Sequence, residues 1–173
     1  MGGKIMFAKE EYVFHESGGI CQISDIQVAP LDNMPADRQY YVMKPLYDPN
    51  SVIYMPVDSD CIFLRRLISR NEAEELLERI PYVRTIEESN AKLLRAKYIE
   101  AMHTHDPVEW VRVIKTVYLR STMQTARSQR ISETERSFAE NAKRNLHTEL
   151  ALALDLPVQK MEDYITERIQ KMA

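Results

Sequence analysis

The chain has little cysteine, little glycine and no long apolar run, and each scarcity excludes a class of protein. Its 173 residues include two cysteines, Cys21 and Cys61, which are too few for a disulfide framework or a four-cysteine zinc site. Four glycines leave no glycine-rich loop of the kind that cradles phosphates. No run approaches the ~20 apolar residues of a membrane-spanning helix, and the N-terminal segment lacks the apolar centre of a signal peptide. We therefore expect a cytoplasmic protein.

What is present is an ordinary globular composition with an uneven distribution of charge. Apolar residues make up 45% of the chain, charged residues 28%, and the net charge is −3, as in many soluble proteins. Residues 112–144 nevertheless carry a net charge of +5, between acidic stretches at 69–111 and 145–173. A basic segment of this kind fits either a footprint for nucleic acid or a solvated helix face followed by a charged loop. Composition alone favours the second interpretation.

The two parts of the chain differ in their local pattern, which predicts an α+β protein. Short apolar runs broken by Gly, Pro, Asp and Asn predict five strands near 11–15, 20–28, 39–44, 51–55 and 60–65, enough for a small, strongly bent sheet or barrel. Helix-start signals follow at Ser69, Thr85, Asp106 and Ser132, each with a glutamate three residues later. They predict helices near 70–80, 86–103, 107–123, 133–154 and 158–172. We expect a β domain at 1–68 and a helical domain at 69–173.

Helical spacing predicts which side chains are buried. In the helix expected at 107–123, Val111, Ile114 and Tyr118 form a core stripe. In the helix expected at 133–154, the stripe consists of Phe138, Ala142, Leu146 and Leu150. The single tryptophan, Trp110, is expected to pack at a helix interface, although an exposed tryptophan can also wedge between bases.

Residues with catalytic or metal-binding chemistry are not grouped in any recognisable pattern. His103 and His105 flank a threonine just before Asp106, but side chains at i and i+2 do not share a helix face, so Asp106 is better interpreted as a helix cap. Cys21 lies in an apolar, strand-like run and is expected in the core. We expect no metal, no cofactor and no small-molecule substrate, and a binding protein rather than an enzyme.

Several segments form a recognisable pattern when they are taken in order. Residues 11–26 (EYVFHESGGICQISDI) are followed by 38–42 (RQYYV), 52–57 (VIYMPV) and 64–65 (LR). Together these segments resemble the opening strands and the frame of the CarD-like family of transcription regulators. Residues 106–120 (DPVEWVRVIKTVYLR) and 146–154 (LHTELALAL) resemble its helical signatures. Where some members carry a tryptophan that wedges into the minor groove, the matching residues 85–91 contain no aromatic side chain.

The resemblance implies a fold and a function for each domain. The first domain would be a Tudor-like barrel, the RNA-polymerase-interacting domain also found in transcription-repair coupling factor, which would add its sheet edge to the polymerase β subunit. The helices would contact promoter DNA near the upstream edge of the melted region. The protein would then be a bacterial, non-catalytic regulator of transcription initiation.

These implications select two sets of candidate residues. For polymerase docking the expected edge is 39–43 or 51–55, with side chains Tyr40, Tyr41, Ile53, Tyr54 and Met55. For DNA the candidates are cations expected to contact phosphates without reading sequence, namely Lys92, Arg95, Lys97, Arg112, Lys115, Arg120, Arg127 and Arg130. The alternative is a protein–protein adaptor that docks on RNA polymerase or another partner and makes no functional DNA contact.

Overall fold

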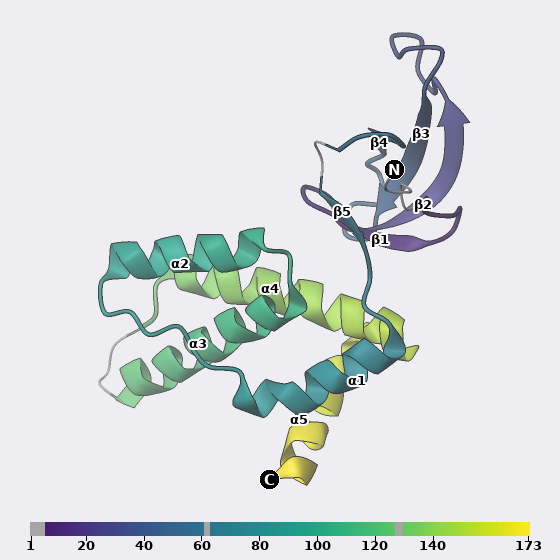
Figure 1. Cartoon of the computed structure of the whole chain (residues 1–173). Coiled ribbons are helices and arrows are strands. Elements are labelled where there is room, and N and C mark those ends of the chain that lie inside the picture. The colour runs from purple at the N-terminus through teal and green to yellow at the C-terminus, as the bar shows by residue number, and fades with distance from the viewer. Residues whose placement is uncertain (1–5, 61–62, 127–129) are drawn as a thin grey trace. The chain divides into compact units, whose positions relative to one another are not determined.

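The structure, a computed structural model, describes residues 6–60, 63–126 and 130–173 (Figure 1). The chain divides into two compact units, Met1–Leu67 and Ile68–Ala173. The first is called the β unit and the second the helical unit. Each is described by itself below. Cys61 and Arg127, both considered above, lie outside the described residues.

The β unit is one antiparallel sheet, as the sequence predicts. Its five described strands are β1 (Tyr12–His15), β2 (Gly19–Val28), β3 (Gln39–Pro45), β4 (Ile53–Pro56) and β5 (Leu64–Arg66). Their order is β4-β3-β2-β1-β5, so consecutive strands pair as neighbours from β1 to β4, and β5 returns to the free side of β1. Figure 1 shows β2 and β3 as the long, curved strands on which the rest of the sheet is built.

A bulge in β2 produces the bend that the apolar pattern suggested. The register with β3 shifts between Ile23 and Asp25, and the hydroxyl of Ser24, the extra residue, donates a hydrogen bond to the Val42 carbonyl at 3.0 Å. Bulges of this type increase the local twist and curve a sheet over its own core. That core includes Val13, Ile23 and Met43.

Cys21 belongs to the same core, as expected from its apolar surroundings. Its side chain is fully buried, and this burial raises the pKa of the thiol to about 11. A thiol with so little thiolate at neutral pH is a weak nucleophile. Cys21 is therefore a packing residue.

The helical unit contains five described α-helices and two short 3-10 turns. They are α1 (Arg70–Arg79), η1 (Ile80–Tyr82), α2 (Ala91–His103), α3 (Pro107–Ala126), α4 (Glu133–Leu154), η2 (Val158–Lys160) and α5 (Met161–Met172). Complete capping boxes stand at Ser69 and Ser132, and the Asp106 carboxylate accepts a hydrogen bond from the Val108 amide at 2.8 Å. Three of the four expected helix starts are thus confirmed.

The fourth expected start, at Thr85, is wrong. Residues 83–90 are not helical, and α2 begins after Asn90, whose side chain caps the amides of Lys92 and Leu93. The reason is tertiary: the Ile86 amide donates to the buried Thr116 hydroxyl of α3 at 2.8 Å. This bond and the burial of Ile86 hold the segment extended, which outweighs a local capping preference.

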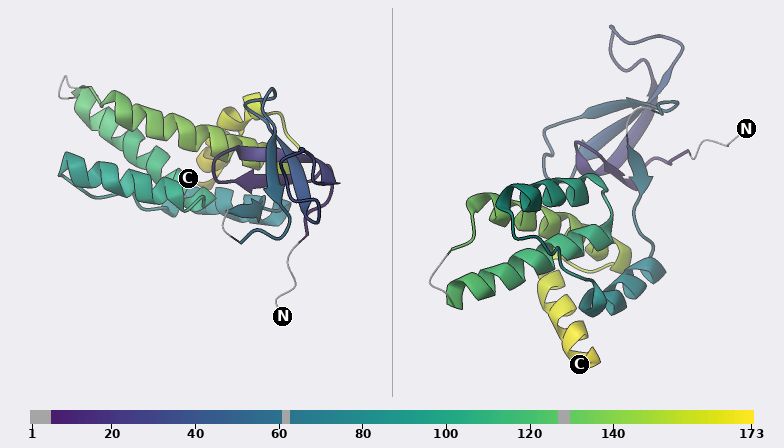
Figure 2. Two further views of the ribbon diagram at one scale, coloured as in Figure 1. Left: turned by 90° about the horizontal axis from the view of Figure 1, so that it is seen from above. Right: turned by 60° about the vertical axis from the view of Figure 1, so that its left-hand side comes forward.

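The helices α3 and α4 form the centre of this unit and run side by side (Figure 2). The expected stripe on α4 is buried at Ala142, Leu146 and Leu150. On α3 the expected stripe is buried at Val111 but not at Tyr118. Trp110 and Val113 are completely buried, whereas Tyr118 is 73% exposed. Because α3 contacts both α2 and α4, the buried face is wider than one stripe and includes Trp110, as predicted for a packing tryptophan.

Candidate protein and nucleic-acid interfaces

The sheet topology leaves β4 with an open edge. β3 is hydrogen-bonded to β2 on one side and to β4 on the other. Among the described residues no strand pairs with the outer side of β4. An open edge is the structural requirement for adding a strand from another protein, so β4 is the candidate docking edge on this side of the sheet.

The register shows which backbone groups of β4 are available. The Val57 amide donates to the Gln39 carbonyl at 2.9 Å, and pairing alternates along an antiparallel ladder. Met55 and Ile53 therefore direct their backbone groups toward β3, whereas Tyr54 directs its amide and carbonyl outward. The next outward position is Pro56, which has no amide to donate. The Pro56 carbonyl already accepts a hydrogen bond from the Ser59 amide at 3.1 Å. The open edge thus offers the amide and the carbonyl of Tyr54.

This geometry corrects part of the sequence-based docking set. The segment 39–43 lies in the inner strand β3, so it is not an edge. Tyr40, Tyr41 and Met55 are buried, and the Tyr41 hydroxyl accepts a hydrogen bond from the Phe7 amide at 3.0 Å inside the core. Aromatic, β-branched strands suit both inner and edge positions, which is why composition did not separate them. Ile53 and Tyr54, each partly exposed, remain as candidates.

Several cations proposed for DNA contact are engaged within the protein, and Lys115 is the clearest case. Its ammonium group donates to the carbonyls of Ile80, Pro81 and Val83 at 2.8, 3.0 and 2.7 Å. An ammonium group has three protons to donate, so these three bonds use all of them. Lys115 therefore fixes the end of α1 and η1 on α3 and is not available to a phosphate.

Arg120 also has an internal role. Its Nε donates to the Glu135 carboxylate at 2.7 Å, and the Tyr98 hydroxyl donates to the same oxygen at 3.4 Å. These contacts join α2, α3 and α4. The buried Tyr98 has a pKa raised well above its usual range, first by burial and then by the Glu135 charge, so it stays protonated and acts as a donor.

Two further candidates are paired near the surface. Lys97 lies 3.1 Å from Glu88 and lowers the pKa of that carboxyl group together with the Asn90 amide, which is the larger cause. Arg112 lies 3.5 Å from Glu109, one turn away on α3. Exposed pairs of this kind contribute little to stability, so a competing anion can displace them.

The remaining described candidates are unpaired. Lys92, Arg95 and Arg130 are exposed, and none forms an ion pair with a described residue. Lys92 and Arg95 are three residues apart on α2 and so lie on one helix face. This pair forms an exposed cationic surface on α2.

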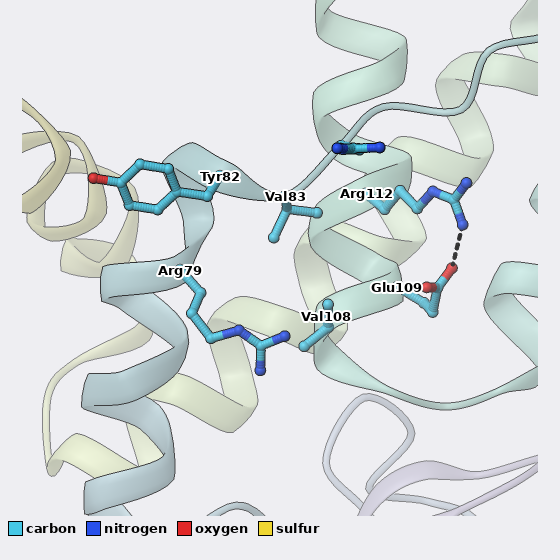
Figure 3. Close-up of a pocket in the computed structure, with 7 residues that line it drawn as sticks. Arg79, Tyr82, Val83, Val108, Glu109 and Arg112 are labelled. Carbon is cyan, nitrogen blue, oxygen red and sulfur yellow. Dashed lines mark ion pairs between the residues drawn. The ribbon is translucent and has the colours of Figure 1, made fainter.

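The sequence-based selection missed two arginines that the fold brings to Arg112. Arg79 at the end of α1 and Arg84 after η1 line the same surface cleft as Arg112 (Figure 3). Both lie in a stretch whose net charge is negative, so a count along the chain concealed them. The sequence signal that could have found them is the close spacing of these two arginines on either side of Tyr82. The segment is too irregular to predict a helix face.

Within the described part of the chain, no group of three or more His, Cys, Asp or Glu side chains is arranged to hold a metal ion. The described helices include none with the length and apolar content needed to cross a membrane.

Comparison with known families accounts for both units. Residues 7–68 match the family model described as CarD-like/TRCF RID domain, and residues 81–166 match the model described as CarD, C-terminal domain. No curated protein matches the chain. The two family matches follow the same order as the β sheet and the helical bundle, with the open β4 edge inside the first and the α2 cations inside the second. The chain belongs to the CarD-like family of RNA-polymerase-interacting transcription factors.

Proposed function

We propose that this protein regulates transcription initiation by docking β4 on the polymerase β subunit and presenting the helical unit to promoter DNA. The observation that carries the proposal is the open edge at Tyr54 in a domain of the polymerase-interacting family. Addition of a strand at that edge supplies main-chain hydrogen bonds, and Ile53 and Tyr54 supply side-chain contacts. No catalytic step is involved, and the protein would act in the cytoplasm of a bacterium.

The DNA contact in this proposal is weak by itself. The net charge of the chain is −3, and phosphate contacts dominate the affinity of proteins for DNA. Lys92, Arg95 and Arg130 are exposed cations that can contact backbone phosphates without base preference. Docking on polymerase would raise their effective concentration beside DNA, so that a weak contact becomes sufficient.

An alternative is an adaptor that docks on polymerase without a functional DNA contact. It is favoured by the internal engagement of Lys97, Arg112, Lys115 and Arg120, and by the absence of an aromatic side chain at 85–91. The two functions differ in what they require of the exposed cations of the helical unit.

Binding of the full chain to a purified polymerase β-lobe fragment tests the docking step. We expect saturable binding that Tyr54→Glu weakens at least tenfold, because the new charge would lie beside the side chains of the added strand on one face of the sheet. The matched control is Tyr118→Glu, the same substitution at an exposed tyrosine of the helical unit, which should bind like the wild type. Equal binding by the two variants would exclude β4 as the docking edge.

Promoter-dependent transcription then separates the regulator from the adaptor. The triple variant Lys92→Glu, Arg95→Glu and Arg130→Glu keeps β4 intact. Under the proposed function it should still bind the β-lobe fragment and lose its effect on initiation. An unchanged effect on initiation would favour the adaptor.

A further inference from the structure

A cleft of about 370 Å³ in the helical unit is lined by three arginines from three separate segments. Arg79 comes from the last turn of α1, Arg84 from the extended segment after η1, and Arg112 from α3. Figure 3 shows Arg79 reaching from α1 toward Val108 on α3, and Arg112 on the other side of Val83 and Val108. The two valines form an apolar strip between cationic sides.

The cleft carries excess positive charge. Among the described residues that line it, Glu109 alone is acidic, and its carboxylate is 3.5 Å from Arg112. Arg79 and Arg84 are exposed and form no ion pair with any described residue. Two guanidinium groups are therefore unneutralised, and the third has a surface partner that an anion can replace.

The backbone that presents these arginines is held in place by Lys115. It donates hydrogen bonds to the carbonyls of Ile80, Pro81 and Val83. These three residues lie between Arg79 and Arg84 in the sequence. The Ile86 amide, bound to Thr116, fixes the other end of the segment. A preformed backbone reduces the entropy lost when a ligand binds. Lys115 and Thr116 thus support the cleft from α3 without entering it.

The chemistry of the lining selects a phosphate-bearing strand. Guanidinium groups bind phosphate in a bidentate manner. Because Arg79 and Arg112 lie on opposite sides of an apolar strip, they are better placed for successive phosphates of one strand than for a single small anion. The valines can then face the sugars. We propose that this arginine cleft binds the phosphate backbone of nucleic acid; this inference rests on the DNA contact of the proposed function and adds residues outside α2 to it.

The first test removes the two unpaired charges. The double variant Arg79→Gln, Arg84→Gln and its control Lys160→Gln, Lys171→Gln lose the same net charge, and the control lysines are exposed on the η2–α5 segment. Binding of the full chain to a labelled duplex of ~30 base pairs is measured between 50 and 200 mM salt. The affinity of the cleft variant for duplex should be about tenfold lower at ~100 mM salt. The slope of log affinity against log salt concentration should be smaller in magnitude by about two. The control should lose much less.

The second test increases the effective positive charge of the cleft. A cleft with only a structural role would not bind duplex more tightly as a result. Glu109→Gln frees Arg112 and should tighten duplex binding several-fold. The control Glu133→Gln removes a carboxylate that also lies in the first turn of a helix and also pairs with an arginine three residues later, Arg136, at 3.3 Å. Equal gains from both variants would attribute the effect to net charge and contradict the cleft.

A third arm distinguishes strand phosphates from a free phosphorylated ligand. Inorganic pyrophosphate is added at millimolar concentration while the arginine Nε signals are followed by NMR. Shifts at Arg79, Arg84 and Arg112 with duplex but not with pyrophosphate support the proposal. Shifts with pyrophosphate alone would overturn the assignment to a nucleic-acid strand. A wild-type chain that fails to bind duplex at 50 mM salt would refute the cleft but not a contact that depends on docking. Duplex binding that the cleft variant leaves unchanged would refute the cleft and support a DNA contact elsewhere on the helical unit.

Discussion

The β unit and the helical unit stabilise their irregular segments in different ways. The β unit relies on its backbone ladder and an apolar core, and its buried polar side chains are few, with His15 among them. The helical unit fixes its irregular segments with side chains from α3 and α4: Lys115 binds the carbonyls around η1, Thr116 binds the Ile86 amide, and Glu149 accepts from the Ile68 amide at 2.9 Å. Charged residues in the helical unit therefore also serve as structural partners of the backbone, as Lys115 and Glu149 do.

The largest effect is expected from Lys115→Met. This change leaves three backbone carbonyls without their charged donor, and hydrogen bonds to charged groups are worth about 1.5–3 kcal/mol each when buried. Because part of this site is open to water, we expect a loss of about 2–3 kcal/mol in the free energy of unfolding. Urea denaturation followed by Trp110 fluorescence measures it, since Trp110 is the single tryptophan and is buried in the helical unit.

The control for this prediction is Lys143→Met on α4. Lys143 pairs with Glu162 at 2.6 Å, but both side chains are substantially exposed. Exposed ion pairs contribute about 0–1 kcal/mol. A loss at Lys143 equal to that at Lys115 would mean that charge, rather than the carbonyl contacts, stabilises the unit.

A smaller effect is expected from Thr116→Val. Valine keeps the shape of the side chain but removes the acceptor of the Ile86 amide and the donor to the Arg112 carbonyl. Leaving a buried amide without a partner costs about 1–2 kcal/mol, again read by Trp110 fluorescence. Thr122→Val is the matched control, because Thr122 is exposed and bonds only within its own helix. Identical stabilities of the two variants would contradict the role given to Thr116.

The smallest effect is expected in the β unit, at His15. Its Nδ1 accepts hydrogen bonds from the amides of Ser17 and Gly18 at 3.3 and 3.1 Å, which closes the turn between β1 and β2 and requires the neutral ring. Burial holds the pKa of His15 below its usual range, with Glu16 partly opposing. The unfolded chain then binds more protons than the folded one, so this contribution is complete above about pH 6.5 and is lost as pH falls.

His15→Leu should therefore cost about 1 kcal/mol at pH 7.5 and progressively less toward pH 5. Urea unfolding followed by the amide NMR signals of β1 and β2 measures the difference. A cost that does not change with pH would show that packing, and not the acceptor Nδ1, is what His15 provides. A cost above that of Lys115→Met would reverse the contrast between the two units.

The sequence predicts most of the elements because their signals are local. The capping boxes at Ser69 and Ser132 place two helix starts correctly, and the short apolar runs place the strand ends to within two residues or, at β5, four. The start of α2 was missed because Thr116, on another helix, competes for the Ile86 amide. Residue spacing predicted a single buried stripe that included Tyr118, because spacing cannot show how many other helices a helix packs against.

The candidate sites are less predictable, because pairing is a property of space and not of sequence. The +5 charge of 112–144 fitted either a nucleic-acid footprint or a solvated helix face, and charge alone could not show that Arg120, Arg136 and Lys143 are paired with carboxylates. Conversely, Arg79 and Arg84 come from an acidic stretch and reach Arg112 only through the fold. An open edge at β4 also requires the strand order, which no local pattern contains.

The return of β5 to β1 has a consequence for how the protein is made. Val13 pairs with Arg66, from opposite ends of the β unit, whereas β1 to β4 pair with their sequence neighbours. The first four strands can assemble as they leave the ribosome, but β1 stays without its second partner until residue 66 has emerged. Closing such a long loop is slow, and an uncovered strand invites mispairing with other chains. We therefore expect nascent chains paused before that point to be prone to aggregation.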